Sequence, residues 1–240
     1  MKIGAHISTA GGVHNIFQRA EEIEAEAVQM FISGRTNWRA PVFKEESLSA
    51  FYEIKSTNDT PLFFHGIYLI NLATQDPEHL EKSKESLRNY MDWAGKLGVT
   101  GTIFHLGSHK GVGFNEMQDQ ICRAMVEVLD SSDNNAKLII ENSAGGGNTV
   151  GSRFSEIGSI LDHCGKHPRI AVCLDTCHLF SVGYDISTPA GCATVMEEFE
   201  KEIGLERLIA VHANDSKTPF KSVDFKPFLA KCVQVPTSAS

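Results

Sequence analysis

Short apolar runs alternate with longer amphipathic stretches along most of the chain. Each run has three to five residues, rich in Ile, Val and Phe, and between the runs lie segments whose apolar positions have helical spacing. Short continuous runs of this kind are typical of strands buried on both faces, as in a parallel sheet. Seven such runs predict strands, at residues 3–5, 27–31, 61–64, 102–104, 138–140, 170–174 and 208–211.

Two of the intervening segments carry clear helix signals. Asp76 and Pro77 predict the start of a helix, and Gly98 predicts its end, because a polar cap, an early proline and a terminal glycine favour those positions. Residues 115–129 have apolar positions every three to four residues, which also indicates a helix. Strands that alternate with helices in this way predict an α/β fold.

Composition narrows the class of protein. The chain has 240 residues, 42% of them hydrophobic, which suits one α/β barrel or two small domains. No stretch approaches the roughly 18 apolar residues of a membrane span, and the N-terminus lacks the apolar region of a secretory signal. We therefore expect no membrane contact, a cytoplasmic location with a nuclear or organellar pool as the alternative, and six reduced cysteines.

The net charge of −8 argues against nucleic-acid binding through bulk positive charge. It leaves open a protein that carries its positive charge as bound metal ions.

Five consecutive runs end in a residue type that binds metals, at intervals of 34 to 40 residues: His65, His105, Glu141, Asp175 and His212. Each interval is close to one strand–helix unit. In a (β/α)₈ barrel the carboxyl ends of all strands meet on one face, which carries the active site. A single residue of this kind could be a helix cap, but burying five unpaired polar groups would cost several kcal/mol each. Imidazoles with carboxylates predict a site for Zn²⁺, Mn²⁺ or Fe²⁺ rather than Ca²⁺.

Other polar features carry weaker predictions. His6 also ends an apolar run, and we expect it to give structural support rather than to bind metal. His79, His163 and His167 fall away from strand ends and are predicted to be solvated. The glycine-rich residues 143–148 lack the following Lys-Ser/Thr of a phosphate-binding loop.

Three longer motifs carry a family resemblance. They are HGIYLINLA at residues 65–73, VCLDTCH at 172–178 and VHANDSK at 211–217. With these motifs the sequence resembles endonuclease IV, a family of metal-dependent apurinic/apyrimidinic endonucleases of base-excision repair. The resemblance covers residues 1–217, which we expect to form one TIM-barrel domain, and leaves 218–240 as a divergent tail.

The resemblance implies a monomeric zinc enzyme with up to three Zn²⁺ ions. It implies hydrolysis of the phosphodiester 5′ to abasic sites in double-stranded DNA, and trimming of blocked 3′ ends. Carried over by position, His65, His105 and Glu141 would hold one ion, and Glu141, Asp175 and His212 a second. His178 would hold a third, and the bridging Glu141 would be the catalytic residue.

The same resemblance places three residues in loops that probe DNA: Arg35, Tyr68 and Leu69. Arg39, Lys110, Lys217 and Lys221 are further candidates for phosphate contacts, with ordinary solvated surface charge as the alternative for Lys110 and Lys221.

The carboxyl-terminal segment departs from the family pattern. Asp224 stands where the family has a metal-binding Asp, but Lys226 occupies the place of the following His, and no Glu or His follows Asp224. The strand count of seven predicts a barrel that is incomplete at its C-terminal end, with exposed edges on the first and seventh strands. Residues 229–235 have strand-like character and are the candidate to cover part of this gap. We therefore expect a truncated, frameshifted or alternatively spliced form of a longer enzyme.

Two other functions stay open from the sequence. A sugar isomerase or epimerase could use a similar cluster on a TIM barrel, although the loops with Arg35 and Tyr68 have no obvious role on a free sugar. A non-catalytic remnant that binds metal or damaged DNA is the third hypothesis.

Overall fold

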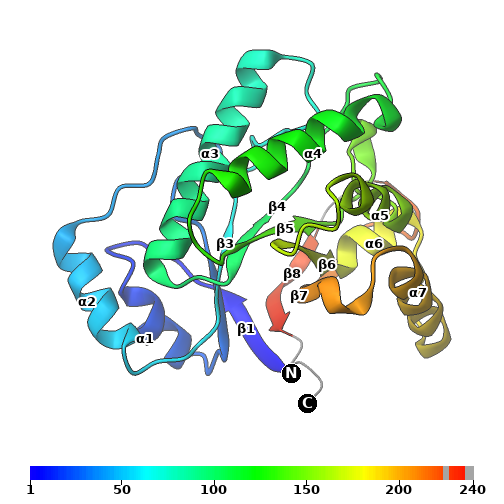
Figure 1. The fold of residues 1–240 in the computed structure, drawn as a ribbon. Coiled ribbons are helices and arrows are strands. Elements are labelled where there is room, and N and C mark those ends of the chain that lie inside the picture. The colour runs from blue at the N-terminus through cyan, green and yellow to red at the C-terminus, as the bar shows by residue number, and fades with distance from the viewer. Residues whose placement is uncertain (224–226, 236–240) are drawn as a thin grey trace.

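Seven parallel strands form one curled sheet, and helices connect consecutive strands (Figure 1). The computed structural model describes residues 1–223 and the backbone of residues 227–235. The parallel strands are β1 (Lys2–His6), β2 (Ala27–Met30), β3 (Leu62–His65), β4 (Gly101–Phe104), β5 (Lys137–Glu141), β6 (Ile170–Asp175) and β7 (Leu208–Ser216). Each pairs with the next in chain order, which confirms the predicted α/β fold with seven parallel strands.

The eighth position of the barrel holds a strand of opposite direction. Strand β8 (Pro227–Val235) pairs antiparallel with β1 on one side and with β7 on the other. Both edges that a seven-strand count leaves open are therefore hydrogen-bonded, and the sheet closes without an eighth parallel strand. The sequence predicted a strand here but not its direction. Asp224 and Lys226 lie outside the described residues.

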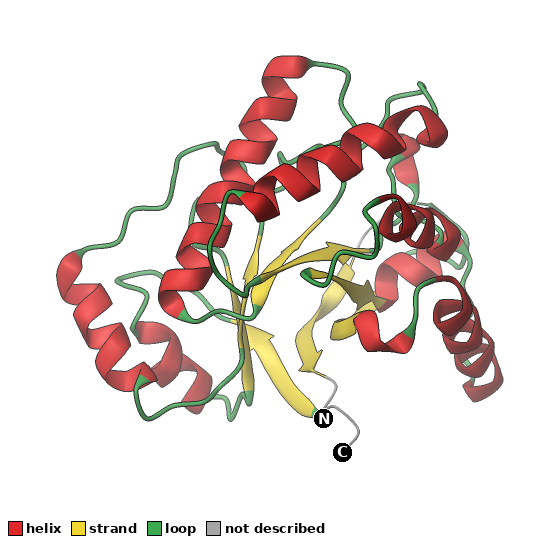
Figure 2. Cartoon of the chain, viewed as in Figure 1, coloured by secondary structure: helices red, strands yellow, loops and turns green. Residues whose placement is uncertain are grey.

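Helices cover the outer face of the sheet (Figure 2). They are α1 (Asn15–Glu21), α2 (Glu45–Lys55), α3 (Pro77–Leu97), α4 (Phe114–Asp130), α5 (Phe154–His163), α6 (Thr176–Val182) and α7 (Pro189–Glu202), with short 3₁₀ turns η1 (Gly146–Asn148) and η2 (Leu205–Arg207). Among the described residues, no helix is both long and apolar enough to cross a membrane.

Helix α3 has the ends that the sequence predicts. The carboxylate of Asp76 accepts hydrogen bonds from the backbone N–H groups of Glu78 and His79, at 3.0 and 3.3 Å. Pro77 occupies the first turn, and Gly98 ends the helix at φ +62°, a left-handed conformation that glycine adopts without steric cost. These ends fix where the loop after β3 enters the helix.

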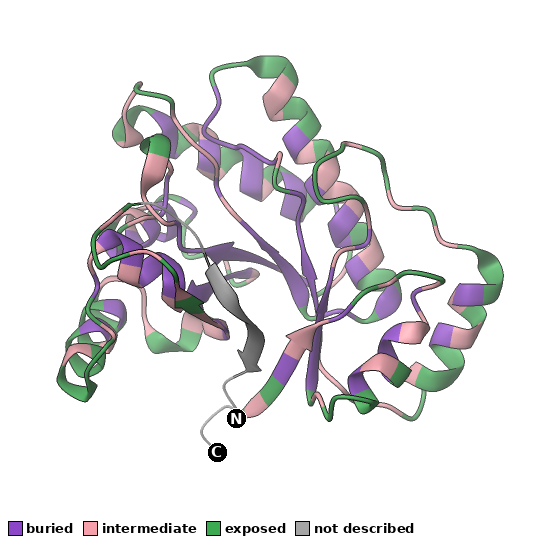
Figure 3. Cartoon of the chain, turned by 180° about the vertical axis from the view of Figure 1, so that it is seen from behind, coloured by how far each residue is buried: buried purple, intermediate pink, exposed green. Residues whose placement is uncertain are grey.

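Strands β2 to β6 are buried along almost their whole length (Figure 3). Two apolar layers explain why their sequences are continuous hydrophobic runs. The larger layer lies between the sheet and the helices and includes Phe64, Phe104 and Ile140. A smaller cluster fills the barrel interior, and its members are Phe63, Ile103, Ile139, Ala171, Cys173 and Ala210. Side chains alternate between the two faces of a strand, so both alternating sets are apolar here.

Candidate metal centre

The alternation of side chains along the strands places the predicted ligands inside the barrel. Each lies two residues after a member of the interior cluster, and residues two apart on a strand face the same side. These pairs are Phe63 and His65, Ile103 and His105, Ile139 and Glu141, Cys173 and Asp175, and Ala210 and His212. The apolar cluster therefore forms the floor of the site, and the ligand candidates form the next layer toward the carboxyl ends of the strands.

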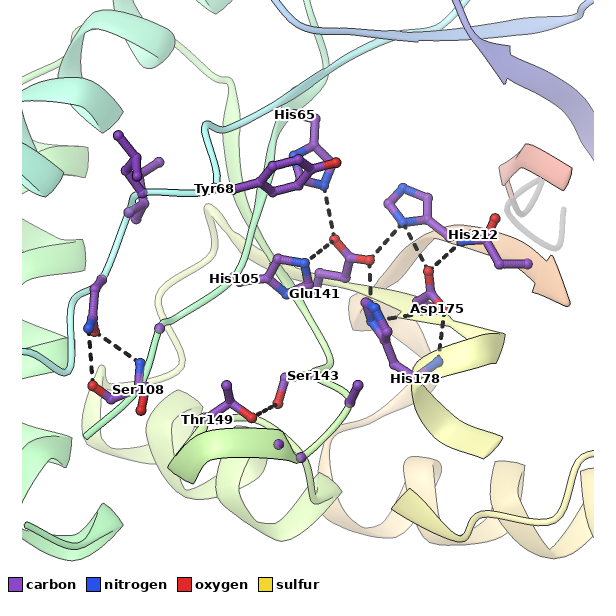
Figure 4. A pocket seen from close by; sticks show the side chains of 18 of the residues that line it. His65, Tyr68, His105, Ser108, Glu141, Ser143, Thr149, Asp175, His178 and His212 are labelled. Carbon is purple, nitrogen blue, oxygen red and sulfur yellow. Dashed lines mark hydrogen bonds and ion pairs between the residues drawn. The ribbon is translucent and has the colours of Figure 1, made fainter. Parts of the chain in front are cut away.

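Glu141 lies at the centre of this layer (Figure 4). Its Oε2 is 3.1 Å from Nε2 of His65 and 3.3 Å from Nε2 of His105. Its Oε1 is 2.9 Å from Nδ1 of His212 and 3.5 Å from Nδ1 of His178. One carboxylate therefore contacts four imidazoles, two on each oxygen.

These contacts divide the site into two groups that share Glu141. In the first, ligand atoms of His65, His105 and Glu141 all lie within 4.8 Å of one another. In the second, the same holds for Glu141, Asp175 and His212. The family resemblance implied both sets, and the structure brings the members of each close together.

His178 reaches the site from helix α6 rather than from a strand end. Asp175 caps this helix, and its Oδ1 accepts a hydrogen bond from the backbone N–H of His178 at 2.9 Å. Nδ1 of His178 lies 2.7 Å from the backbone carbonyl oxygen of Asn142, which orients the ring. On the other oxygen of Asp175, the Asn214 side-chain amide donates a hydrogen bond of 2.5 Å.

Burial and contacts within the cluster shift the pKa values of its side chains. Burial alone would raise the pKa of Glu141, but the imidazoles of His105, His212 and His65 hold it well below its usual value. Burial alone would lower the pKa of His212, but Cys173 and Glu141 raise it well above its usual value. Burial lowers the pKa of His105 to about 4, and it raises the pKa of Asp175. Without a metal, Glu141 is therefore ionised and His212 carries the balancing proton.

The donor set fits divalent transition-metal ions. Imidazole nitrogens and carboxylate oxygens are the ligands that Zn²⁺, Mn²⁺ and Fe²⁺ use in proteins. Nδ1 of His105 is buried, and within the described part of the chain it has no hydrogen-bond partner. Buried polar atoms without a protein partner are uncommon and are typically satisfied by an ion or water.

The predicted DNA-probing residues gather on the rim of the same site. Tyr68 is 53% exposed, and its ring lies 5.5 Å from that of His65 in an edge-on arrangement. The backbone N–H of Tyr68 donates to the carbonyl of Arg35 at 2.9 Å, and the Arg35 guanidinium lies over Phe31. Leu69 is the next residue of this loop and lines the cavity. Two loops far apart in the sequence therefore meet beside the candidate metal ligands.

The cavity between these loops and the ligands has a volume of about 820 Å³. Lys110 and residues 143–146 of the glycine-rich segment also line this cavity. Lys221 instead lies over the ring of Phe220, with its ammonium 5.3 Å from the ring centre. Of the two lysines with an open role, only Lys110 lines the cavity.

Comparisons with known proteins decide the family. The family model described as "Xylose isomerase-like TIM barrel" matches residues 17–229. A protein of Halothermothrix orenii named "Probable endonuclease 4" is 36% identical over 218 residues, which are 90% of this chain and 78% of that one. The chain belongs to the endonuclease IV family. The crystal structure of endonuclease IV from Thermus thermophilus superposes with a TM-score of 0.82 at 30% identity, over 94% of this chain and 80% of that one.

A more distant structure shares the fold alone. A D-tagatose 3-epimerase-like protein superposes with a TM-score of 0.68 at 16% identity, over 92% of this chain and 79% of that one. This chain and that protein therefore share a fold. The identity to endonuclease IV relatives favours a nuclease over the isomerase or epimerase hypothesis.

Two residues of this candidate site, Gln29 and His79, were missed or placed differently by the sequence patterns. Gln29 lies in an apolar run, yet it pairs in register with Phe63 and therefore also faces the barrel interior. Its Oε1 is 2.6 Å from Nε2 of His212, and its Nε2 is 3.1 Å from Nδ1 of His6. His6 thus supports a ligand through Gln29, in line with the structural role expected for it. A lone polar residue in an apolar strand was the signal for Gln29.

The structure contradicts the prediction that His79 is solvated. It is partly buried, it lines the cavity, and its Nε2 lies 2.8 Å from the carbonyl oxygen of Leu69. The prediction placed it correctly outside the strand ends but did not foresee that the loop after β3 folds back over the start of α3.

Proposed function

We propose that this chain is a metal-dependent DNA repair endonuclease that hydrolyses the phosphodiester 5′ to an abasic site. The products would be a 3′-hydroxyl and a 5′-deoxyribose phosphate, and the same site would trim blocked 3′ ends. Membership of the endonuclease IV family supports the nuclease class. The observation that carries the finer proposal is one buried carboxylate, Glu141, shared between two ligand groups beneath loops that resemble DNA-probing elements.

The described residues offer two groups of three candidate ligands for divalent ions, and the two groups share Glu141. His65, His105 and Glu141 would hold one ion, and Glu141, Asp175 and His212 a second. His178 would hold a third, and Asp224, its proposed companion, lies outside the described residues. Zn²⁺ suits this imidazole-rich set, with Mn²⁺ or Fe²⁺ as alternatives. Bound ions would supply Lewis acidity and concentrated positive charge against the phosphodiester.

The protein's own side chains have separate tasks in this proposal. Glu141 would set the spacing between the two ions, because its two oxygens face different groups of imidazoles. Tyr68, Leu69 and Arg35 would contact DNA at the rim, where the abasic nucleotide leaves the stack. Unstacking costs least at a damaged position, so this step would also select the substrate.

Local charge would replace the bulk positive charge that the chain lacks. Its net charge is −8, but the exposed side chain of Arg35 and the cavity-lining Lys110 lie on the active face. Phosphate contacts to such cations make binding weaker at higher salt. We therefore expect binding of an abasic duplex to depend on salt with a shallow slope, set by few phosphate contacts.

The test is incision of an end-labelled duplex that contains one tetrahydrofuran abasic analogue. This analogue cannot undergo β-elimination, so a cut that leaves a 3′ end extendable by a polymerase reports hydrolysis on the 5′ side. An undamaged duplex of the same sequence is the control. A folded, metal-loaded protein that binds the abasic duplex but does not cut it would be the remnant of the third hypothesis. A protein without preference for the abasic duplex would contradict the proposal.

A further inference from the structure

His79 makes two side-chain contacts that belong to different loops of the active face. Its Nε2 lies 2.8 Å from the carbonyl oxygen of Leu69, in the loop after β3. Its ring packs edge-on against Trp38, in the loop after β2, with ring centres 5.4 Å apart and an interplanar angle of 87°. A carbonyl oxygen can only accept a hydrogen bond, so Nε2 of His79 is the donor. This assigns the proton of a neutral His79 to Nε2.

The backbone of His79 is held on both sides. Its N–H donates to the Asp76 carboxylate at the start of α3, and its carbonyl accepts a hydrogen bond of 2.8 Å from the hydroxyl of Ser83. The same Ser83 oxygen accepts a hydrogen bond of 3.0 Å from the backbone N–H of Asn71. The start of α3 thus binds the loop after β3 at two points, Leu69 and Asn71. An imidazole on so fixed a backbone can restrain the groups that it contacts.

The two loops also contact each other directly, through the hydrogen bond from the N–H of Tyr68 to the carbonyl of Arg35. Arg35 and Trp38 lie on one loop, and Tyr68 and Leu69 on the other. His79 therefore closes a ring of contacts that runs from one loop to the other and back through α3. Of the contacts named here, only the backbone hydrogen bond between Tyr68 and Arg35 would still join the two loops if the His79 side chain were removed.

We propose that His79 is a positioning residue that joins these two loops into one rigid DNA-probing unit. This role rests on the proposed function, since it assumes that Tyr68 and Leu69 contact the abasic site. The side chain of His79 contacts Leu69 and Trp38 rather than a metal ligand, so its loss should weaken DNA binding and leave the hydrolytic step intact. The sequence motif around it gives no hint of this role, because the residue lies on a helix and not in a loop.

Two substitutions separate the two contacts. His79→Phe keeps an aromatic ring beside Trp38 but removes the donor to Leu69, whereas His79→Gln keeps an N–H donor and removes the ring. The matched control is His163→Gln on α5, an exposed histidine whose Nδ1 bonds to the backbone carbonyl of Ser159. The measurements are the Kd for a tetrahydrofuran duplex by fluorescence anisotropy, kcat at saturating DNA, and hydrogen exchange of residues 66–72 without DNA.

A neutral hydrogen bond of this kind contributes about 1 kcal/mol, so His79→Phe should weaken binding roughly fivefold. We expect kcat to stay within about twofold of the wild type and exchange in residues 66–72 to become faster. His79→Gln should recover most of the loss in Kd, and His163→Gln should match the wild type. Unchanged Kd and exchange in His79→Phe would overturn the proposal. Equal loss of kcat and Kd would assign His79 to general folding instead.

The experiment also separates this proposal from the proposed function. If the wild type does not prefer the abasic duplex, the proposed function fails and the DNA-probing role of His79 fails with it. If the wild type binds and cuts the abasic duplex while His79→Phe is indistinguishable from it, only the role of His79 fails.

Discussion

Gln29 gives the sharpest test of how the proposed metal ligands are held in place. Its side-chain amide lies between two histidines, with Oε1 2.6 Å from Nε2 of His212 and Nε2 3.1 Å from Nδ1 of His6. With the amide in this orientation, His212 donates from Nε2, and its Nδ1, which faces Glu141 and Asp175, carries the lone pair that binds a metal. Replacing Gln29 by Met keeps a similar volume in the 4% exposed position but removes both hydrogen bonds.

The size of the effect follows from the loss of a group that orients a ligand. Removing such a partner typically lowers metal affinity about 10- to 100-fold, or roughly 1.4 to 2.7 kcal/mol. The unsatisfied Nε2–H of His212 left in a buried site would cost about 1–3 kcal/mol, which is the same range. The loss should fall on the ion held by Glu141, Asp175 and His212. The ion held by His65 and His105 should bind with unchanged affinity.

The assay is a competition titration of metal-free protein with a chromophoric zinc chelator. Gln29→Met should show one weakened site, whereas Gln29→Glu keeps an acceptor for His212 and should bind at least as tightly as the wild type. Thermal unfolding of the metal-free variants separates a loss of ligand orientation from a loss of fold. Equal zinc affinities for Gln29→Met and the wild type would refute the idea that Gln29 sets the His212 tautomer.

Three further predictions address the loops, the rim and the proton balance. Gly107→Ala should lower the free energy of unfolding by about 1–3 kcal/mol in chemical unfolding. Gly107 has φ +96°, and a Cβ there would lie 2.1 Å from Oδ1 of Asn71. A variant as stable as the wild type would contradict this packing. Tyr68→Ala should weaken binding of the abasic duplex by about 1–3 kcal/mol in an anisotropy titration if its ring stacks on DNA, whereas Tyr52→Ala on α2 should not. The pKa of His212 is raised, so His212 should be protonated near pH 7 without metal. Zinc binding should therefore release a proton, and the zinc affinity should increase as the pH rises toward that pKa. Calorimetry in buffers of different ionisation enthalpy measures this release, and a binding enthalpy independent of the buffer would contradict it.

The sequence was sufficient to predict the strand ends because the barrel has a simple period. Every second side chain of a strand faces the interior, so His65, His105 and Glu141 follow interior residues at a spacing of two. Gln29 also occupies an interior-facing position, but it lies within an apolar run and ends no strand. Its role depends on its contact with His212 across the barrel. A long-range contact of this kind leaves no local pattern.

The start of α3 and the closing strand show the same limit in different ways. The cap at Asp76 was readable because it is local, but the contact of His79 with Leu69 requires the loop after β3 to turn back over the helix. The strand-like character of residues 229–235 indicated a strand but carried no information about its direction. Its antiparallel pairing joins it to β1 and β7, which are far from it along the chain or separated from it by a turn, so no local pattern encodes it.

The most direct test of the metal-dependent nuclease is a stepwise zinc titration of chelated protein, with incision of the tetrahydrofuran duplex and bound zinc measured on the same samples. We expect no incision by metal-free protein and recovery as the sites around Glu141 fill. Glu141→Gln, which lacks the shared carboxylate, should not recover. Incision by metal-free protein at the rate of the zinc-loaded form would contradict this expectation, and so would full activity of Glu141→Gln.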